Sequence, residues 1–177
     1  MMQVMKSIYY YEFKYKKLIV QVASSDIGAV KIKIGFKREG DLINDIKGYT
    51  GSIEFHEGFK KNEDLINVLK SYLNGDNPTM DIPWDILGTP FMHDVWESTC
   101  KIPYGETKSY SDIASMAGRP KAARAVGQAL NRNPLLIIIP CHRVVSVSGI
   151  GGFGSGIYMK RYLLNLEGSF INFQGRI

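Results

Sequence analysis

The order of apolar and polar residues predicts a strand-rich segment near the start of the chain. Three stretches are rich in β-forming residues, namely 8–13, 17–22 and 29–36. In the third stretch apolar and basic residues alternate, as in a strand with one buried face. Turn-forming residues at Ser24–Gly28 precede it. We therefore predict an antiparallel meander, followed over residues 37–58 by loops and one weak strand at Ser52–Phe55.

A period of three to four residues appears further along the chain and predicts helices. In residues 62–73 the apolar side chains fall on one face of a helix, which Asn62 can cap and Gly75 can end. Thr89 and Pro90 suit the N-cap and first turn of the next helix. Helices in the second half are expected at 89–99, 109–118, 119–130 and 158–167.

The chain is expected to form two domains. Residues 76–88 carry two prolines and no helical period, which predicts a linker at 78–88 between an N-terminal α/β domain (1–77) and a C-terminal domain (89–177). In the second domain, two short helices around a glycine turn, with alanines on the second helix, are typical of a helix-turn-helix. We predict an α/β (α+β) fold: an antiparallel sheet with a helix, then a helical, winged-helix-like domain. An ordinary helical hairpin is the alternative reading.

The segment Leu135–Arg143 carries the reactive groups. Five aliphatic residues, 135–139, predict a short core strand or the approach to one, and Pro140 ends it because proline has no N–H to donate. A thiol, an imidazole and a guanidinium follow at positions 141, 142 and 143. A cysteine beside a base and a cation can become a nucleophilic thiolate below its free pKa. The alternative is an inert buried cysteine, which is common.

Composition excludes several classes of protein. The 177 residues are 45% hydrophobic and 22% charged, which is typical of a globular protein with a real core. The two cysteines, Cys100 and Cys141, are too few for a disulfide framework or a cysteine-rich zinc site. No apolar run reaches the length of a membrane span, and no secretory signal is evident. We expect a cytoplasmic protein without membrane association.

The excess positive charge lies in the second half of the chain. Residues 1–89 contain 12 Lys and Arg against 12 Asp and Glu, and residues 90–177 contain 10 against 5, which accounts for the net charge of +5. No carboxylate occurs between Asp112 and Glu167. Such a basic stretch is typical of a protein that binds a polyanion, although a solvated basic face explains the charge equally well.

The segment Gly149–Gly154 fits the pattern G-x-G-x-x-G of dinucleotide-binding proteins. That fold needs the motif to open a helix within a βαβ unit with further strands behind it, and only 23 residues follow Gly154. We therefore expect no nicotinamide or flavin cofactor. The glycines suit a mobile loop over the cysteine better.

Several motifs together resemble the O6-alkylguanine-DNA alkyltransferases, also called methylated-DNA–protein-cysteine methyltransferases. They are Pro140-Cys141-His142-Arg143-Val144-Val145, Asn133-Pro134, Ala122–Val126, Ile102–Glu106 and Ser109-Tyr110. The resemblance covers most of residues 89–168. It implies suicidal DNA repair without a cofactor, in which an O6-alkylated guanine is flipped out of double-stranded DNA and its alkyl group moves irreversibly to a cysteine. We expect the protein to act as a monomer.

The resemblance assigns catalytic roles to five residues. Cys141 is the nucleophile, and His142 is its base, acting through a water because neighbours in an extended chain point to opposite faces. Glu167, the only carboxylate among the last 65 residues, orients the imidazole. Tyr110 gives a proton to the departing guanine. Asn133 holds the elbow before the cysteine through bonds to the backbone.

The resemblance also implies contacts with DNA. Arg124 is expected to fill the space left by the flipped base. Ser111 and Arg119, near helix termini, are expected to contact phosphates, and backbone N–H groups of Gly154 and Ser155 to face O6. The other residues predicted to bind DNA are Tyr110, Lys121, Ala123 and Arg143.

The chain departs from the family pattern in its glycine-rich segment, where Phe153 stands in place of a frequent tyrosine. It lacks the N-terminal cysteines that hold zinc in some members, so no metal site is expected. Two other functions remain open: a DNA-binding module that senses lesions without transfer, and a cysteine hydrolase. A reactive Cys141 argues against the first, and the adjacency of Cys141 and His142 is poor geometry for a hydrolytic triad.

Overall fold

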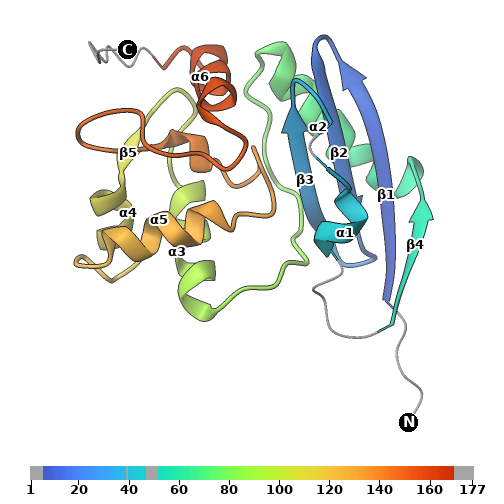
Figure 1. The fold of residues 1–177 in the computed structure, drawn as a ribbon, viewed down its shortest axis with the longest axis horizontal. Helices are drawn as coiled ribbons and strands as arrows, with labels where there is room; N and C mark the ends of the chain where they lie inside the picture. Colours follow the sequence, from blue (N-terminus) through green and yellow to red (C-terminus); the bar gives the residue numbers. More distant parts are fainter. Residues whose placement is uncertain (1–5, 39, 47–51, 170–177) are drawn as a thin grey trace. The chain divides into compact units, whose positions relative to one another are not determined.

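The computed structural model describes residues 6–38, 40–46 and 52–169. The chain divides into two compact units, one formed by Met1–Leu87 with Pro134–Leu136, the other by Gly88–Asn133 with Ile137–Ile177 (Figure 1). The return of three residues, 134–136, to the first unit is a feature that the sequence does not predict. No helix in the described ranges is long and apolar enough to cross a membrane.

The first unit contains a four-stranded sheet in the order β3-β2-β1-β4. Strands β1 (Lys6–Tyr15), β2 (Leu18–Ser24) and β3 (Ala29–Gly35) are joined as antiparallel neighbours, which confirms the predicted meander. Strand β4 (Ile53–Glu57) corresponds to the weak strand predicted at Ser52–Phe55, and it pairs parallel to β1, so the sheet is antiparallel except at this edge. A parallel neighbour needs a crossover connection, and the long segment after β3 supplies one.

Helices α1 (Leu42–Ile46) and α2 (Glu63–Asn74) cover the sheet, and Figure 1 shows α1 in front of it with α2 behind. The short α1 falls in a region predicted to be loop. It buries Leu42 and Ile46 in a core cluster with Ile8, Ala23 and Val30 of the strands. Covering apolar residues on the sheet is the main favourable term in folding such a unit.

The predicted helix 62–73 is confirmed within one residue at each end. The side-chain amide of Asn62 does not cap it but donates to the carbonyls of Tyr9, at 3.0 Å, and Gly58, at 2.7 Å. These bonds tie the start of the helix to the first strand. Gly75 follows the last helical residue with φ +100°, a left-handed conformation that glycine adopts without strain.

The second unit is mainly helical. Its elements are α3 (Pro90–Cys100), β5 (Lys108–Ser109), α4 (Tyr110–Met116), α5 (Ala123–Asn131), β6 (Val144–Val145) and α6 (Ile157–Leu166). The Thr89 hydroxyl accepts a bond from the Met92 N–H at 3.3 Å, as expected of an N-cap. Trp96 is fully buried in the core and donates to the carbonyl of Ala129 at 3.0 Å, which joins α3 to α5.

The helix predicted from Arg119 begins at Ala123 instead, after a turn that follows α4. The preceding helix is confirmed: Ser109 caps α4 in a reciprocal capping box with Asp112. Gly118 lies two residues after the end of α4 and has a left-handed conformation. Pro120 lies in the connection rather than in the first turn of α5, so the two helices are shorter than predicted and the turn between them longer.

The predicted core strand at 135–139 is wrong. Residues 135–139 are largely buried, but the structure describes no strand there, only isolated bridges, one of which is parallel and joins Leu135 to Ile32. Ile137 has a positive φ of 75°, which is rare for a β-branched residue and breaks an extended run. The aliphatic run reflects burial on all sides and not a sheet position, a distinction that periodicity cannot make for so short a segment.

Candidate active site

Cys141 lies in a single 3-10 turn, Cys141–Arg143, and not in an extended chain as predicted. The N–H of Arg143 closes this turn by donating to the carbonyl of Pro140 at 2.9 Å. The argument that Cys141 and His142 must point to opposite faces of a strand therefore does not apply. The turn is buried, and only 7% of Cys141 is exposed. Entry to the sulfur is thus restricted to the cavity that Cys141 lines.

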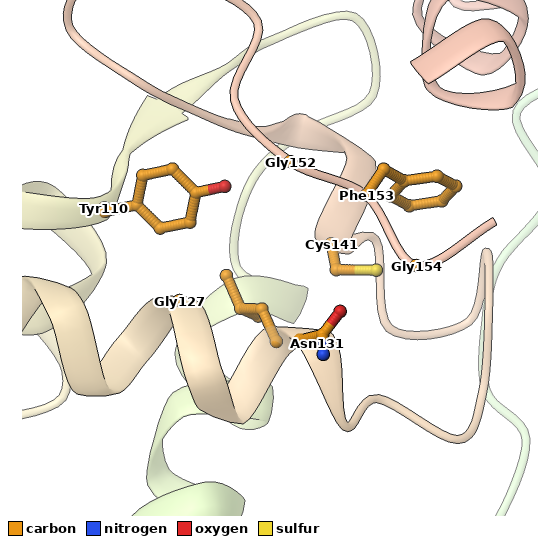
Figure 2. Close-up of a pocket in the computed structure, with 8 residues that line it drawn as sticks. Tyr110, Gly127, Asn131, Cys141, Gly152, Phe153 and Gly154 are labelled. Carbon is orange, nitrogen blue, oxygen red and sulfur yellow. The ribbon is translucent and has the colours of Figure 1, made fainter. Parts of the chain in front are cut away.

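That cavity has a volume of about 240 Å³ and is formed by residues from four parts of the second unit: α4, α5, the cysteine turn and the glycine-rich segment. Figure 2 shows the sulfur of Cys141 between α5 and the glycine-rich segment, with the Tyr110 ring extending from the far side. The lining residues are Tyr110, Gly127, Leu130, Asn131, Cys141, Gly152, Phe153 and Gly154. Gly127, Leu130 and Asn131 were not among the predicted site residues, since in the sequence they look like ordinary positions of a helix.

Asn133 fixes both the sulfur and the backbone before it. Its side-chain N–H group donates to Sγ of Cys141 at 3.0 Å and to the carbonyl of Ile139 at 2.8 Å. Asn133 is itself buried. A donor aimed at sulfur stabilises the thiolate over the thiol, and Asn133 accordingly lowers the pKa of Cys141. The contact with Ile139 agrees with the predicted holding role, while the contact with sulfur goes beyond that prediction.

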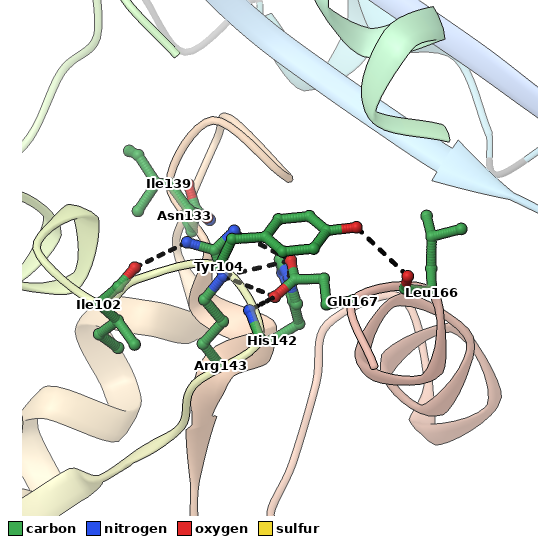
Figure 3. A network of polar contacts seen from close by, with 9 residues as sticks. Ile102, Tyr104, Asn133, Ile139, His142, Arg143, Leu166 and Glu167 are labelled. Carbon is green, nitrogen blue, oxygen red and sulfur yellow. Dashed lines mark hydrogen bonds and ion pairs between the residues drawn. The ribbon is translucent and has the colours of Figure 1, made fainter. Parts of the chain in front are cut away.

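A second group of polar side chains surrounds the carboxylate of Glu167 (Figure 3). Nε2 of His142 lies 2.6 Å from Oε1 of Glu167, and both side chains are fully buried. Arg143 donates from Nε to Oε2 at 2.9 Å and from Nη2 to Oε1 at 3.0 Å, and the N–H of Gly105 donates to Oε2 at 3.1 Å. The carboxylate is therefore held rigidly, and it holds the imidazole in turn.

This arrangement sets the tautomer of the imidazole. When Nε2–H donates to Glu167, Nδ1 is the basic nitrogen of His142. Burial lowers the pKa of His142 and outweighs the hydrogen bond and the charge of Glu167, which raise it. The charges of Arg143 and Lys160 lower it further. The imidazole is therefore neutral at pH 7 and able to accept a proton.

The pKa of Cys141 contradicts the expectation of a resting thiolate. Burial raises the pKa of its thiol to about 11, although Asn133 and the charge of Lys160 act in the opposite direction. Neighbouring groups therefore do not compensate for the loss of water around the sulfur. At pH 7 the site holds a thiol beside a neutral imidazole, and Cys141 can act as a nucleophile only once this proton has left the sulfur.

Tyr110, the first residue of α4, forms the wall of the cavity opposite the cysteine turn. Burial raises the pKa of its phenol, and a hydrogen bond from the backbone of Gly152 lowers it. A Cβ atom on Gly151, which has φ +73°, would lie 2.9 Å from the Tyr110 hydroxyl. Glycine is thus required at position 151, both for its left-handed conformation and for the close approach of the tyrosine.

Lys160 was not predicted as a site residue. It lies on α6, it is fully buried, and its Nζ donates to the carbonyls of Val144 at 2.6 Å and Gly152 at 3.0 Å. Burial lowers its pKa to about 8. In the sequence it counts as one more charge of a basic stretch, and only its depth in the fold distinguishes it.

The residues predicted to bind DNA differ in how far they are exposed. Ser111, Arg119, Lys121 and Arg124 are exposed on α4, on α5 and in the turn between them, and Ala123 is partly exposed. Gly154 lines the cavity and is exposed, and Ser155 follows it. Arg143 does not fit its predicted contact with DNA. Its guanidinium is buried and bonds to Glu167 and, at 2.7 Å, to the carbonyl of Ile102.

Comparison with known proteins shows the family of this chain. Residues 90–169 match the family model of the 6-O-methylguanine DNA methyltransferase DNA-binding domain. A crystal structure of Mycobacterium tuberculosis OGT in complex with DNA is 33% identical in sequence, covers 91% of this chain and 93% of its own, and superposes with a TM-score of 0.77. This chain belongs to the family of methylated-DNA–protein-cysteine methyltransferases. The resemblance recognised in the sequence is thereby confirmed.

Other members of the family are similarly related. The methylated-DNA–protein-cysteine methyltransferase of Methanosarcina acetivorans is 49% identical over 96 residues, which are 54% of this chain and 62% of that protein. The M. tuberculosis methyltransferase is 51% identical over 96 residues, 54% of this chain and 58% of that protein. The alignments thus span about three fifths of the length of these curated relatives. A further structure of M. tuberculosis O6-methylguanine methyltransferase is 32% identical and superposes with a TM-score of 0.74 over 92% of this chain and 93% of its own.

Proposed function

We propose that this protein repairs DNA by moving the alkyl group of an O6-alkylguanine to Cys141, once and irreversibly. One observation carries the proposal. The sulfur of Cys141 lines a cavity and accepts a hydrogen bond from Asn133, and the phenol of Tyr110 lines the opposite side of the same cavity. This is the set of groups that attack on an alkyl carbon requires: a nucleophile, stabilisation of its charge, and a source of protons for the leaving group. The name and substrate of the relatives support it.

The reaction balances within these groups. His142, held by Glu167, takes the thiol proton of Cys141 through an intervening water as Sγ bonds to the alkyl carbon. The bond from that carbon to O6 breaks, and guanine keeps the electron pair. The phenol of Tyr110 gives guanine a proton and recovers one from the imidazole. In sum, the thiol proton ends on guanine and the alkyl group ends on sulfur, without a cofactor.

DNA would be held by a helix-turn-helix formed by α4, the turn around Gly118, and α5. The exposed Arg124 at the start of α5 would occupy the space left by the flipped base, and Ser111 and Arg119 would contact phosphates. Lys121 adds positive charge, and the partly exposed Ala123 allows close approach. Base flipping is required because O6 cannot reach a buried sulfur from inside a duplex.

The further expectations of a monomer and of a cytoplasmic protein belong to the same proposal. A nucleophilic cysteine must stay reduced, and both Cys100 and Cys141 are free thiols. The cavity residues Tyr110 and Cys141 belong to the same unit as Asn133, His142 and Glu167, so a second copy of the chain is not needed for the chemistry.

Intact mass spectrometry tests the proposal directly. The protein is mixed with a duplex containing O6-methylguanine, and with the same duplex containing guanine as a control. We expect the mass to rise by one methyl group per protein, on the peptide that contains Cys141, with the lesion duplex alone. An unchanged mass with retained lesion binding would favour a lesion sensor, and several turnovers per protein would favour a hydrolase.

A further inference from the structure

Lys160 is a buried cation with an unusual set of partners. No part of the residue is exposed, and both bonds from its ammonium go to backbone carbonyls, those of Val144 and Gly152. Buried charges in proteins are normally paired with an opposite charge because desolvation is costly. Among the residues that the structure describes, Lys160 forms no ion pair. Arg143, the other buried cation of this unit, pairs with Glu167.

The two carbonyls belong to the two segments that enclose Cys141. Val144 directly follows the turn that contains the cysteine, and Gly152 lies in the glycine-rich segment that lines the cavity. The backbone of Gly152 also bonds to the phenol of Tyr110. One ammonium group thus joins the cysteine turn to the segment over the cavity and, through Gly152, to the phenol.

The charge of Lys160 also acts on the sulfur. It lowers the pKa of Cys141, and Cys141 in turn raises the pKa of Lys160, although burial has the larger effect and lowers that pKa to about 8. At pH 7 the ammonium is therefore protonated. The other titratable groups near Cys141 are His142 in the same turn, Tyr110 on α4 and Cys100 on α3, and none of them is charged at that pH. The guanidinium of Arg143, also in the turn, is paired with Glu167.

We propose that Lys160 is a positioning residue for alkyl transfer: its ammonium holds the Gly152 segment against the cysteine turn and supplies the positive charge that the sulfur meets as it loses its proton. The proposal rests on the proposed function. A cation buried without an anion is poorly solvated until the thiolate forms, so its interaction is stronger in the transition state than in the resting thiol.

The test uses three variants of the full chain that separate charge from hydrogen bonding. Lys160→Met removes both, Lys160→Gln keeps N–H donors without charge, and Lys160→Arg keeps both. Lys101→Met is the matched control, because Lys101 is exposed in the same unit. After thermal melting has verified the fold, alkylation of Cys141 by iodoacetamide is followed from neutral to alkaline pH without DNA, by the mass of the Cys141 peptide. Methyl transfer from an O6-methylguanine duplex is measured in parallel.

We expect Lys160→Met and Lys160→Gln to slow alkylation at neutral pH about tenfold and to move its pH profile upward by about one unit. Lys160→Arg and Lys101→Met should stay near wild type, and methyl transfer should follow the same order. The proposal would be overturned if Lys160→Gln had the wild-type pH profile of alkylation, or if Lys160→Arg were alkylated as slowly as Lys160→Gln. If Lys160→Met does not fold, the comparison of Lys160→Gln with Lys160→Arg still tests the proposal. Since iodoacetamide needs no DNA, a wild-type protein that fails to take a methyl group would contradict the proposed function alone.

Discussion

The two cysteines of the second unit occupy surroundings that differ in a few contacts, and the difference shows what makes a nucleophile. Cys100, at the end of α3, is exposed as a residue, but its sulfur turns inward and donates to the carbonyl of Ile138 at 3.6 Å. Cys141 instead accepts a hydrogen bond from Asn133 at 3.0 Å and lines a cavity. One sulfur acts as a donor, and the other is prepared to carry negative charge.

Desolvation is common to both sites and therefore cannot explain reactivity. It raises the pKa of Cys100 to about 12 and that of Cys141 to about 11. What Cys141 has in addition is a donor aimed at sulfur, a neutral imidazole as its neighbour, and the charge of Lys160. Under the proposed function, the comparison indicates that the thiol of Cys141 is activated by stabilising the thiolate that proton loss produces, and not by keeping a thiolate at rest.

The largest effect is expected from exchanging the reactive sulfur itself. Cys141→Ala should abolish methyl transfer while leaving DNA binding largely intact, because the exposed basic residues of α4 and α5 are unchanged. Cys100→Ala should transfer a methyl group at nearly the wild-type rate. Single-turnover assays and a binding titration with a lesion duplex measure both. Loss of transfer in the Cys100 variant, or of binding in the Cys141 variant, would contradict the assignment.

Next in size is the removal of the carboxylate that serves Cys141 but not Cys100. Glu167→Gln should slow transfer by about a hundredfold, since the imidazole loses the negative charge of its partner. It should also lower the free energy of unfolding by about 3 kcal/mol or more, because the buried guanidinium of Arg143 loses its counter-charge. Single-turnover rates and urea unfolding report the two effects.

The exposed Glu97→Gln on α3 is the matched control for that variant and should change neither the rate nor the stability. If Glu167→Gln retained the wild-type rate while losing stability, Glu167 would be a structural residue and the imidazole would not depend on it.

Removal of the Asn133 amide that donates to the sulfur of Cys141 should have an intermediate effect on the reactivity of that thiol. Asn133→Leu keeps the approximate volume but removes the N–H that stabilises the thiolate, a contact typically worth about 1.5–3 kcal/mol when one partner is charged. We expect alkylation of Cys141 by iodoacetamide to slow by about ten- to a hundredfold, with Cys100 unaffected. Asn165→Leu, at an exposed position of α6, controls for the substitution. Equal slowing at both cysteines would indicate a general change of fold.

The smallest effect concerns stability against pH. The thiol of Cys141 has a pKa raised from 9.0 to about 11 in the folded protein, so the unfolded chain releases its proton first. The contribution of this thiol to stability is complete below pH 9 and declines as the pH rises toward 11. The free energy of unfolding, measured by urea denaturation, should therefore fall more between pH 8 and pH 11 in wild type than in Cys141→Ser. A parallel decline in both proteins would contradict the raised pKa.

Much of this protein could be predicted from the sequence where the physics is local. Helix periods and caps placed α2, α3 and α4 to within a residue or two, because apolar spacing and the chemistry of Thr89 and Ser109 act within one turn. The alternation in β3 identified its buried face. The motif around Cys141 identified the family, and the matching relatives confirm it.

Tertiary structure alone decided the features that depend on distant residues. The parallel pairing of β4, the buried turn at Cys141 in place of a strand, and the pairing of Arg143 with Glu167, 24 residues away, do not follow from any local pattern. Neither does the difference between Lys160 and its exposed neighbours in the basic stretch. The free-energy cost of burying a charge depends on the groups that surround it in the folded protein. Residues far apart in the sequence supply those groups, so the local sequence does not reveal them.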